Sequence, residues 1–246
     1  NGADLVVSDM SEISVAEIQA WFDEALVTDG WNLTYNHFDA ADEKLRETLT
    51  AIGNGYLGNR GSFEGESASD IHYPGTYIAG MYNSLVTQIS GRDIENEDFV
   101  NVPNWLKINF KIDDEKWFNP NETMINSIHR ELDFRNGLLS KTMIVTDDEG
   151  RQTKIESLRL ASMANMHLAA IKYRITPLNY SGSMSFCSSL DGTHKNEGVK
   201  RYNTLNQQHL EPIEQGGEGN TSFLKVKTTQ SNIEIVEAAK LQFRVN

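Results

Sequence analysis

The sequence predicts a mainly β fold: a large antiparallel β-sandwich preceded by a short N-terminal strand and helix. Two observations lead to this prediction. Apolar and polar residues alternate in many short runs from about residue 106 onward, and the residues after 50 show almost no helical period. Short strands at close spacing are typical of sandwiches. The 246 residues suffice for one large β domain or two small ones.

The N-terminal extension is predicted as a short strand followed by a helix at about residues 14–26. Ser14 lies three residues before Glu17, which is the spacing of a capping box. Apolar residues then recur at helical spacing and form one stripe. An Asp-Gly pair ends the pattern, so we expect residues 1–29 to be separate from a domain that covers residues 30–246.

Strands are predicted wherever the apolar period is two. The residues Asp147 to Gly150 separate two such runs and predict a hairpin turn. The polar, glycine-rich stretch 193–220 predicts a long surface loop instead. The predicted strands lie at residues 106–112, 142–146, 154–160, 171–176, 184–186, 224–226 and 233–235.

Composition excludes several classes of function. Lys and Arg total 22 against 35 Asp and Glu, which gives a formal net charge of −13. Nucleic-acid binding needs a basic face, and so does docking on anionic lipid, so we expect neither a nucleic-acid partner nor a membrane. The single cysteine, Cys187, excludes an intramolecular disulfide and is expected to be a buried, inert thiol. This cysteine usage favours a cytoplasmic protein.

The densest local pattern is a glycine-rich segment at residues 51–65. Gly53, Gly55 and Gly58 fit a loose GxGxxG spacing, which is found in dinucleotide-binding loops. Such a loop must open a helix, and residues 60–65 are poorly suited to that. No phosphate-loop Lys-Ser/Thr pair follows. We therefore interpret the segment as a glycine-rich turn that packs beneath other elements.

Five segments carry a longer ordered pattern, at residues 47–64, 74–82, 102–105, 132–139 and 156–162. Together they resemble glycoside hydrolase family 65, which includes maltose, trehalose and kojibiose phosphorylases and acid trehalases. Two departures are small. Asn59 stands where the family often has Val, and Ser62 stands where it often has Asn.

The resemblance implies a supersandwich of the galactose-mutarotase-like kind. In the family, a helical linker, an (α/α)6 barrel and a small sheet follow it. The catalytic Glu and the phosphate-binding residues belong to the barrel, so we expect a non-catalytic domain whose partner is the barrel of the same parent chain. We also consider a sandwich truncated at its C-terminal end. No cofactor is implied, and inorganic phosphate is the co-substrate if the parent is a phosphorylase.

Residues 2–13 resemble something different, the C-terminal end of a haloacid-dehalogenase-type phosphatase close to β-phosphoglucomutase. A plain leader helix is the alternative. An inverting phosphorylase releases β-glucose 1-phosphate from an α-glucoside, and β-phosphoglucomutase consumes that product. This pairing favours phosphorolysis over hydrolysis in the parent.

Eight residues are candidates for a functional site. Arg and aromatic side chains suit sugar or domain contacts. If the sandwich were itself catalytic, His129 and Glu131 would share one strand face and could act as acid and base. His72 is expected to support a loop, and no His, Cys, Asp or Glu grouping has metal-site spacing. The binding or interface candidates are Asn54, Tyr56, Arg60, Glu64, Tyr77 and Trp105.

Three functions therefore compete. The first is a structural and interface domain of a disaccharide phosphorylase, or of a trehalase-like hydrolase. The second is an independent carbohydrate-binding module with a saccharide as partner, and the third is a mutarotase-like enzyme. A sandwich fold alone does not separate them. Loss of a covering barrel would expose apolar surface, so self-association into a homo-oligomer is also expected.

Overall fold

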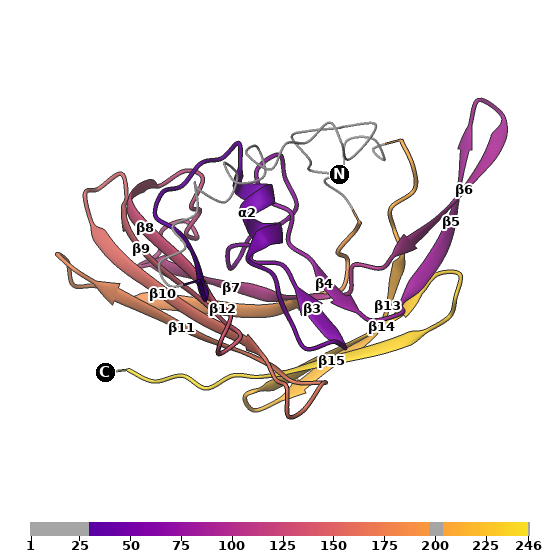
Figure 1. Cartoon of the computed structure of the whole chain (residues 1–246). Coiled ribbons are helices and arrows are strands. Elements are labelled where there is room, and N and C mark those ends of the chain that lie inside the picture. Colours follow the sequence, from indigo (N-terminus) through magenta and orange to yellow (C-terminus); the bar gives the residue numbers. More distant parts are fainter. Residues whose placement is uncertain (1–29, 197–203, 246) are drawn as a thin grey trace, which may run out of the picture.

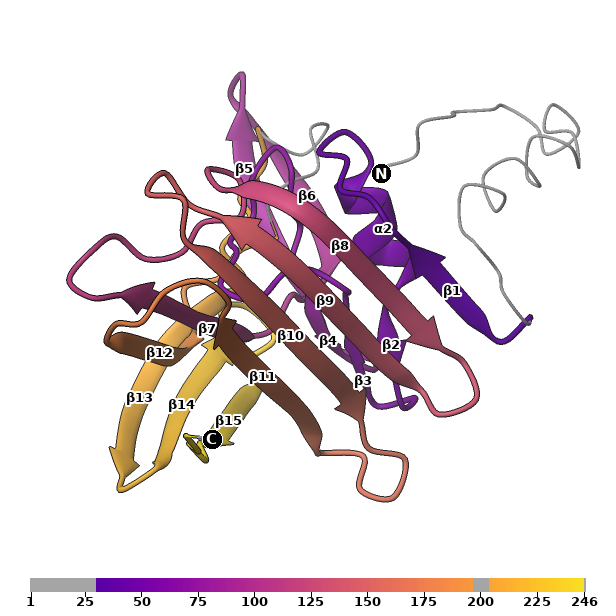
Figure 2. The ribbon, with the colours of Figure 1, turned by 90° about the vertical axis from the view of Figure 1, so that its left-hand side faces the viewer.

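The computed structural model describes residues 30–196 and 204–245, and its regular secondary structure is almost wholly antiparallel strand (Figures 1 and 2). This confirms the predicted mainly β fold. The predicted N-terminal strand and helix lie outside the described residues. Among the residues described, no helix is long and apolar enough to cross a membrane.

The largest sheet has five strands in the order β1-β8-β9-β10-β11. All neighbours are antiparallel, and the hairpin β9–β10 turns at Asp147, whose Oδ1 accepts from the backbone N–H groups of Glu149 and Arg151. The predicted turn at 147–150 is thereby confirmed. The strands are β1 (Asn32–Tyr35), β8 (Met124–Asp133), β9 (Leu138–Thr146), β10 (Gln152–Ala161) and β11 (Ala169–Pro177).

A second layer is formed by β7 (Asn104–Ile112) and β12 (Met184–Asp191), which pair with each other. Strand β7 confirms the alternation expected at residues 106–112. Its inward side chains pack against those of the five-stranded sheet, and this packing encloses the main hydrophobic core. The buried members of that core are Phe63, Phe110, Ile112, Ile128, Met143, Val145 and Ile155.

A third sheet contains β13 (Leu210–Glu218), β14 (Thr221–Thr228) and β15 (Glu234–Lys240). The long surface loop expected over residues 193–220 is therefore wrong for residues 210–218. Strand β13 is an exposed edge strand whose backbone pairs with β14, so it needs no apolar alternation. Gly216 permits this pairing because a side-chain Cβ there would lie 2.7 Å from the ring of Phe223.

Smaller elements connect these layers. The only described helix, α2 (Glu43–Leu49), lies beside the small sheet of β2 (Ile52–Gly53), β3 (Leu57–Asn59) and β4 (Thr76–Ile78) (Figure 1). Strands β5 (Tyr82–Ile89) and β6 (Arg92–Phe99) form a hairpin that projects from the body of the molecule.

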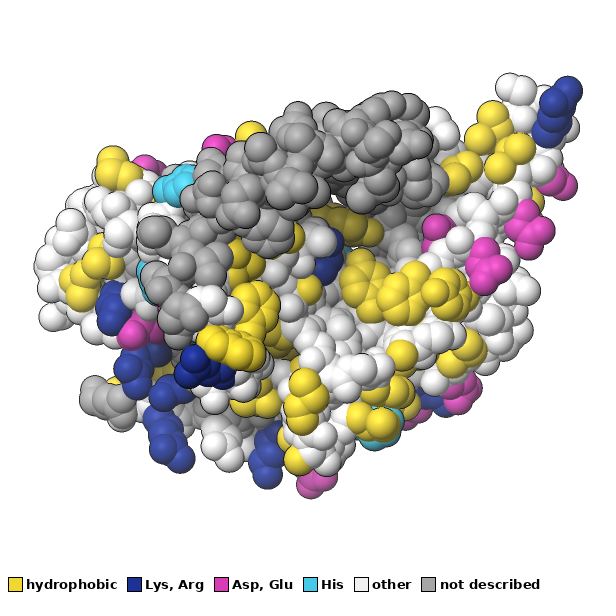
Figure 3. All heavy atoms as spheres, viewed as in Figure 1, with side chains coloured by type: hydrophobic (Ala, Val, Ile, Leu, Met, Phe, Trp, Pro, Cys, Tyr) yellow, Lys and Arg dark blue, Asp and Glu magenta, His cyan; other side chains and the backbone are white. Residues whose placement is uncertain are grey.

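Cys187 is exposed, so the expectation of a buried thiol is wrong. Its strand, β12, pairs only with β7, which leaves the other edge of β12 without a neighbouring strand among the described residues. Burial on this strand is consequently low. In Figure 3, acidic side chains gather toward the β5–β6 hairpin, and basic side chains gather at the other side of the same face.

Candidate functional site

A buried ion-pair cluster lies beneath the glycine-rich segment. The Glu64 carboxylate accepts from Arg159 Nε at 3.0 Å and from Arg159 Nη2 at 2.6 Å, and it also pairs with Lys141 Nζ. Glu64 is 1% exposed at its side chain. Burial alone would raise the pKa of Glu64, but Arg159 and Lys141 outweigh it and hold the pKa well below its usual range. Burial and the neighbouring Arg159 lower the pKa of Lys141 to about 8, against the opposing pull of Glu64.

A second polar cluster surrounds α2. Glu43 pairs with Arg130. Glu47 accepts from the backbone N–H of Tyr73 at 2.7 Å and lies 2.9 Å from His72 Nδ1. Burial would lower the pKa of His72, but Glu47 raises it above its ordinary value. These contacts hold the loop before β4 in place. His72 thus supports a loop, as the sequence suggested.

Ligand atoms of Glu43, Glu47 and His72 lie within 4.8 Å of one another, a grouping that the spacing in the sequence did not indicate. Buried carboxylate and imidazole groups are also the donors of metal sites. Here Arg130 supplies a positive charge to Glu43, and the Tyr73 N–H and His72 engage Glu47. The protein's own groups thus satisfy both carboxylates.

Asn54 and Tyr56 hold the loop between β10 and β11. Asn54 Nδ2 donates to the carbonyl oxygens of Ser162 at 2.7 Å and Met166 at 3.0 Å. Asn54 Oδ1 accepts from two backbone N–H groups of its own turn. Tyr56 packs edge-on against His167, with the ring centroids 4.4 Å apart. The glycine-rich turn therefore positions a loop more than one hundred residues away in sequence.

His129 and Glu131 lie together on β8, as their spacing predicts. His129 Nε2 is 3.9 Å from Glu131 Oε2, and the His129 side chain is 51% exposed. Asn36 Oδ1 lies 2.7 Å from His129 Nδ1. Neither residue lines the pocket described below. Trp105 is half-buried on β7, and its enclosed Nε1 has no hydrogen-bond partner among the described residues.

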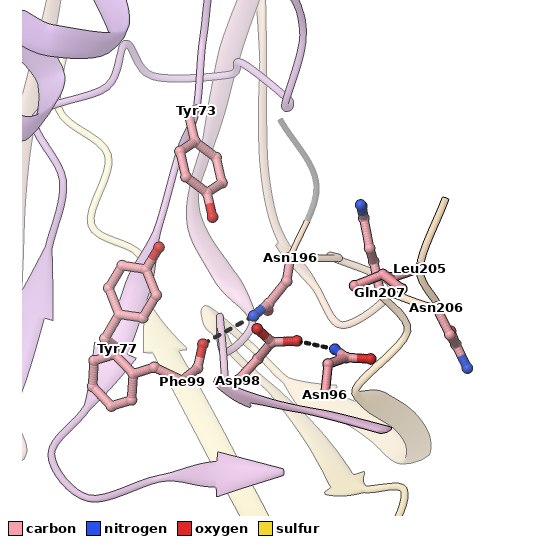
Figure 4. Close-up of a pocket in the computed structure, with 9 residues that line it drawn as sticks. All are labelled: Tyr73, Tyr77, Asn96, Asp98, Phe99, Asn196, Leu205, Asn206 and Gln207. Atoms are coloured by element: carbon pink, nitrogen blue, oxygen red, sulfur yellow. Dashed lines mark hydrogen bonds between the residues drawn. The ribbon is translucent and has the colours of Figure 1, made fainter. Parts of the chain in front are cut away.

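A pocket of about 260 Å³ lies between β4, β6 and the segments at residues 196 and 205–207 (Figure 4). Tyr77 and Phe99 stack there, with ring centroids 5.1 Å apart and ring planes 14° apart. Burial raises the pKa of the Tyr77 hydroxyl. The lining residues are Tyr73, Tyr77, Asn96, Asp98, Phe99, Asn196, Leu205, Asn206 and Gln207.

Arg60 supports this pocket from behind. Its Nε donates to the Tyr73 carbonyl at 2.7 Å, and its guanidinium lies 4.7 Å from the Tyr73 ring centroid. Another of its nitrogens donates to the carbonyl of Lys44 on α2 at 2.8 Å. Of the six binding or interface candidates, Tyr77 lines the pocket and Arg60 braces it.

The other lining residues were not singled out from the sequence. Asn96 and Asp98 stand two apart on β6, a spacing that puts both on one face of a strand. That signal was available, but the acidic run around them resembles a solvated surface. The segments at 196 and 205–207 reach the pocket only through tertiary packing.

Comparison with known proteins gives the family. The model for the N-terminal domain of glycosyl hydrolase family 65 matches residues 33–246. An uncharacterized glycosyl hydrolase of Mycobacterium tuberculosis is 41% identical over 212 residues, which are 86% of this chain and 16% of that protein. A kojibiose phosphorylase of Caldanaerobacter subterraneus is 32% identical over 197 residues, 80% of this chain and 24% of the relative.

One solved structure has the same fold. It is described as "Putative kojibiose phosphorylase from human microbiome", and it matches with a TM-score of 0.70 and 21% identity over 87% of this chain and 30% of that chain. The chain thus spans less than a third of each of these relatives. The family match over nearly all described residues decides the assignment, and the chain belongs to glycosyl hydrolase family 65, as its N-terminal domain.

Proposed function

We propose that this chain is the non-catalytic N-terminal domain of a longer polypeptide that cleaves α-glucosidic disaccharides. The observation that supports this most is that the buried carboxylates are engaged by groups of the domain itself. Glu64, Glu43 and Glu47 are each engaged by cationic or backbone groups inside the domain. A general acid needs a carboxyl group within reach of a glycosidic oxygen. The exposed pair of His129 and Glu131 does not line the pocket between β4 and β6.

The reaction that we propose for the longer polypeptide is inverting phosphorolysis. A carboxylic acid of its barrel protonates the glycosidic oxygen, and a phosphate oxygen attacks the anomeric carbon from the opposite face. The old C–O bond breaks as the new one forms, which releases β-glucose 1-phosphate and the second sugar. Curated relatives named kojibiose, α,α-trehalose and maltose phosphorylase support this choice over hydrolysis.

The loop after β10 is the part that we propose to contact the barrel. Met163, Met166 and Leu168 are 78%, 51% and 52% exposed. Asn54 and Tyr56 hold this loop in place, so an apolar surface is presented in a fixed position. Flexible methionine side chains suit a packed interface. Two of the residues that the sequence indicated for an interface would then act through the loop that they anchor.

The test is disaccharide cleavage by the longer polypeptide and by this chain, assayed in parallel with and without phosphate. Kojibiose, maltose, trehalose and nigerose form the panel. We expect phosphate-dependent cleavage by the longer polypeptide and none by this chain. Cleavage that is equally fast without phosphate would make the parent a hydrolase. Turnover or anomer exchange by this chain alone would overturn the non-catalytic role.

A further inference from the structure

We propose that the pocket between β4 and β6 is a binding site for a neutral sugar residue. This goes beyond the non-catalytic role. It holds whether the longer polypeptide uses phosphate or water, because described residues of this chain line the pocket.

The first argument is the aromatic wall of the pocket. Phe99 is 37% exposed. Its ring stacks on Tyr77, with the centroids 5.1 Å apart, and is tilted against Tyr82, with the centroids 5.3 Å apart. These two ring contacts limit the movement of the Phe99 ring. The electron-rich face of an aromatic ring attracts the C–H groups on the apolar face of a pyranose. An exposed ring of limited movement at a pocket wall is therefore suited to a sugar.

The second argument is the polar side, which faces this wall in Figure 4. Asn96 Nδ2 donates to Asp98 Oδ2, while Asn96 Oδ1 is enclosed and accepts no hydrogen bond from the described residues. Asn196 is fixed by donating to the Phe99 carbonyl at 2.9 Å and accepting from Asn101 N–H at 2.9 Å. The amide groups are thus held in place before any ligand arrives.

The third argument is charge. Among the described residues that line the pocket, Asp98 carries the only carboxyl group and none has a cationic side chain. His209 Nε2 lies 3.2 Å from Asp98, but burial lowers the pKa of His209 despite that carboxylate, which keeps the imidazole neutral near pH 7. Phosphate and sugar phosphates would meet the Asp98 carboxylate, with no cationic side chain beside it among these residues. Amide and carboxylate groups beside an aromatic ring instead match the hydroxyl groups of a neutral sugar.

The size of the pocket limits the ligand further. Pockets for drug-sized ligands occupy about 300–1,000 Å³. The 260 Å³ here suits one pyranose unit. A disaccharide would place one ring in the pocket and leave the other in solvent.

The experiment is calorimetric titration of the full chain with glucose, kojibiose, maltose, trehalose and glucose 1-phosphate. The key variant is Phe99→Leu, which keeps apolar volume but removes the ring. Its matched control is Gln88→Ala, because Gln88 lies near the tip of the same hairpin, where it pairs with Asp93, six residues along β6 from Phe99. Circular dichroism checks that both variants fold.

We expect saturable binding of at least one neutral sugar and weaker binding of glucose 1-phosphate. Phe99→Leu should weaken the sugar affinity about fivefold to tenfold, and Gln88→Ala should leave it unchanged. Gln207→Ala is a second test variant and should also weaken the sugar affinity, since it removes a lining amide and leaves the aromatic rings unchanged. No saturation by any sugar would overturn the proposal. Equal effects of Phe99→Leu and Gln88→Ala, or binding of a small amine instead of sugar, would do the same.

Discussion

Single residues in this domain gain their roles from partners far away in sequence. Glu64 meets Lys141 and Arg159, which lie 77 and 95 residues further along the chain. The glycine-rich pattern drew attention to Glu64, but only the fold reveals the two cations that surround it. Asn54 shows the same principle, because its amide holds a loop 108 residues away. Spacing in the sequence can identify such residues as unusual, but it cannot specify their partners.

Replacing Glu64 by Gln should destabilise the domain strongly. The variant leaves Lys141 and Arg159 buried without an anion, and the loss of one partner of a buried ion pair costs about 3–5 kcal/mol. Glu122→Gln is the control, since Glu122 pairs with Lys116 at the surface and such pairs contribute about 0–1 kcal/mol. Urea unfolding measures both. Similar losses for the two variants would contradict the structural role assigned to Glu64.

Glu237 predicts a pH dependence of stability. It lies on β15 with its Oε1 enclosed and without a hydrogen-bond partner, and burial raises its pKa from 4.5 to about 8. The folded state therefore holds a proton that the unfolded state releases, so the contribution of Glu237 is fully present below pH 4.5 and is lost as the pH rises toward 8.

Glu237→Gln should remove this loss. We expect the variant to be about 1–3 kcal/mol more stable than the natural sequence at pH 7.5, and close to it at pH 4.5. Glu234→Gln provides the control, because Glu234 is on the same strand but exposed and paired with Lys225. Urea unfolding at the two pH values is the measurement. A stability difference for Glu237→Gln that does not change with pH would refute the assignment.

At the scale of elements, the alternating pattern was clearest in three strands that have one buried face. Strand β7 and the hairpin β9–β10 alternate clearly because one face of each packs into the core. The hairpin β5–β6 and strand β13 were missed because most of their side chains are exposed. Backbone pairing with a neighbouring strand holds these segments in the β conformation, so their side chains need not alternate and the sequence pattern indicates them poorly.

The contact between the end of α2 and the glycine-rich segment can be tested with two glycines. A Cβ at Gly61 would lie 2.1 Å from Thr50 Oγ1 and 2.8 Å from the Thr50 carbonyl oxygen, whereas a Cβ at Gly58 would meet nothing within 4 Å. We expect Gly61→Ala to destabilise the domain by about 1–3 kcal/mol through overpacking. Gly58→Ala should change the stability little or raise it slightly. Thermal unfolding of both variants decides this, and equal melting temperatures would count against the packing described.

For the whole molecule, the sequence predicted the class of fold but not how the layers meet. Alternation indicates which face of a strand is buried, and it does not indicate which sheet covers that face. The resemblance to family 65 supplied the family, which the comparisons support. The pocket between β4 and β6 stayed hidden because its residues come from four separate stretches of the chain.

The exposed loop after β10 gives a prediction about the state of the domain in solution. Met163 is 78% and Met166 is 51% exposed, and contiguous apolar surface favours association. We expect the isolated chain to self-associate at high concentration and to bind an apolar dye. The double variant Met163→Lys with Met166→Lys should weaken both properties, as measured by sedimentation velocity and dye fluorescence.

Met124→Lys is the matched control for this experiment. Met124 is 65% exposed, and it pairs with Thr146, which in turn pairs with Gln152 at the start of β10. It therefore lies at the opposite end of the five-stranded sheet from the loop that follows Ala161. Removal of one apolar side chain at that end should leave association unchanged. Met124→Lys would weaken association as much as the double variant does only if added positive charge on an acidic protein were the cause. That result would contradict the prediction that the loop is the contact surface.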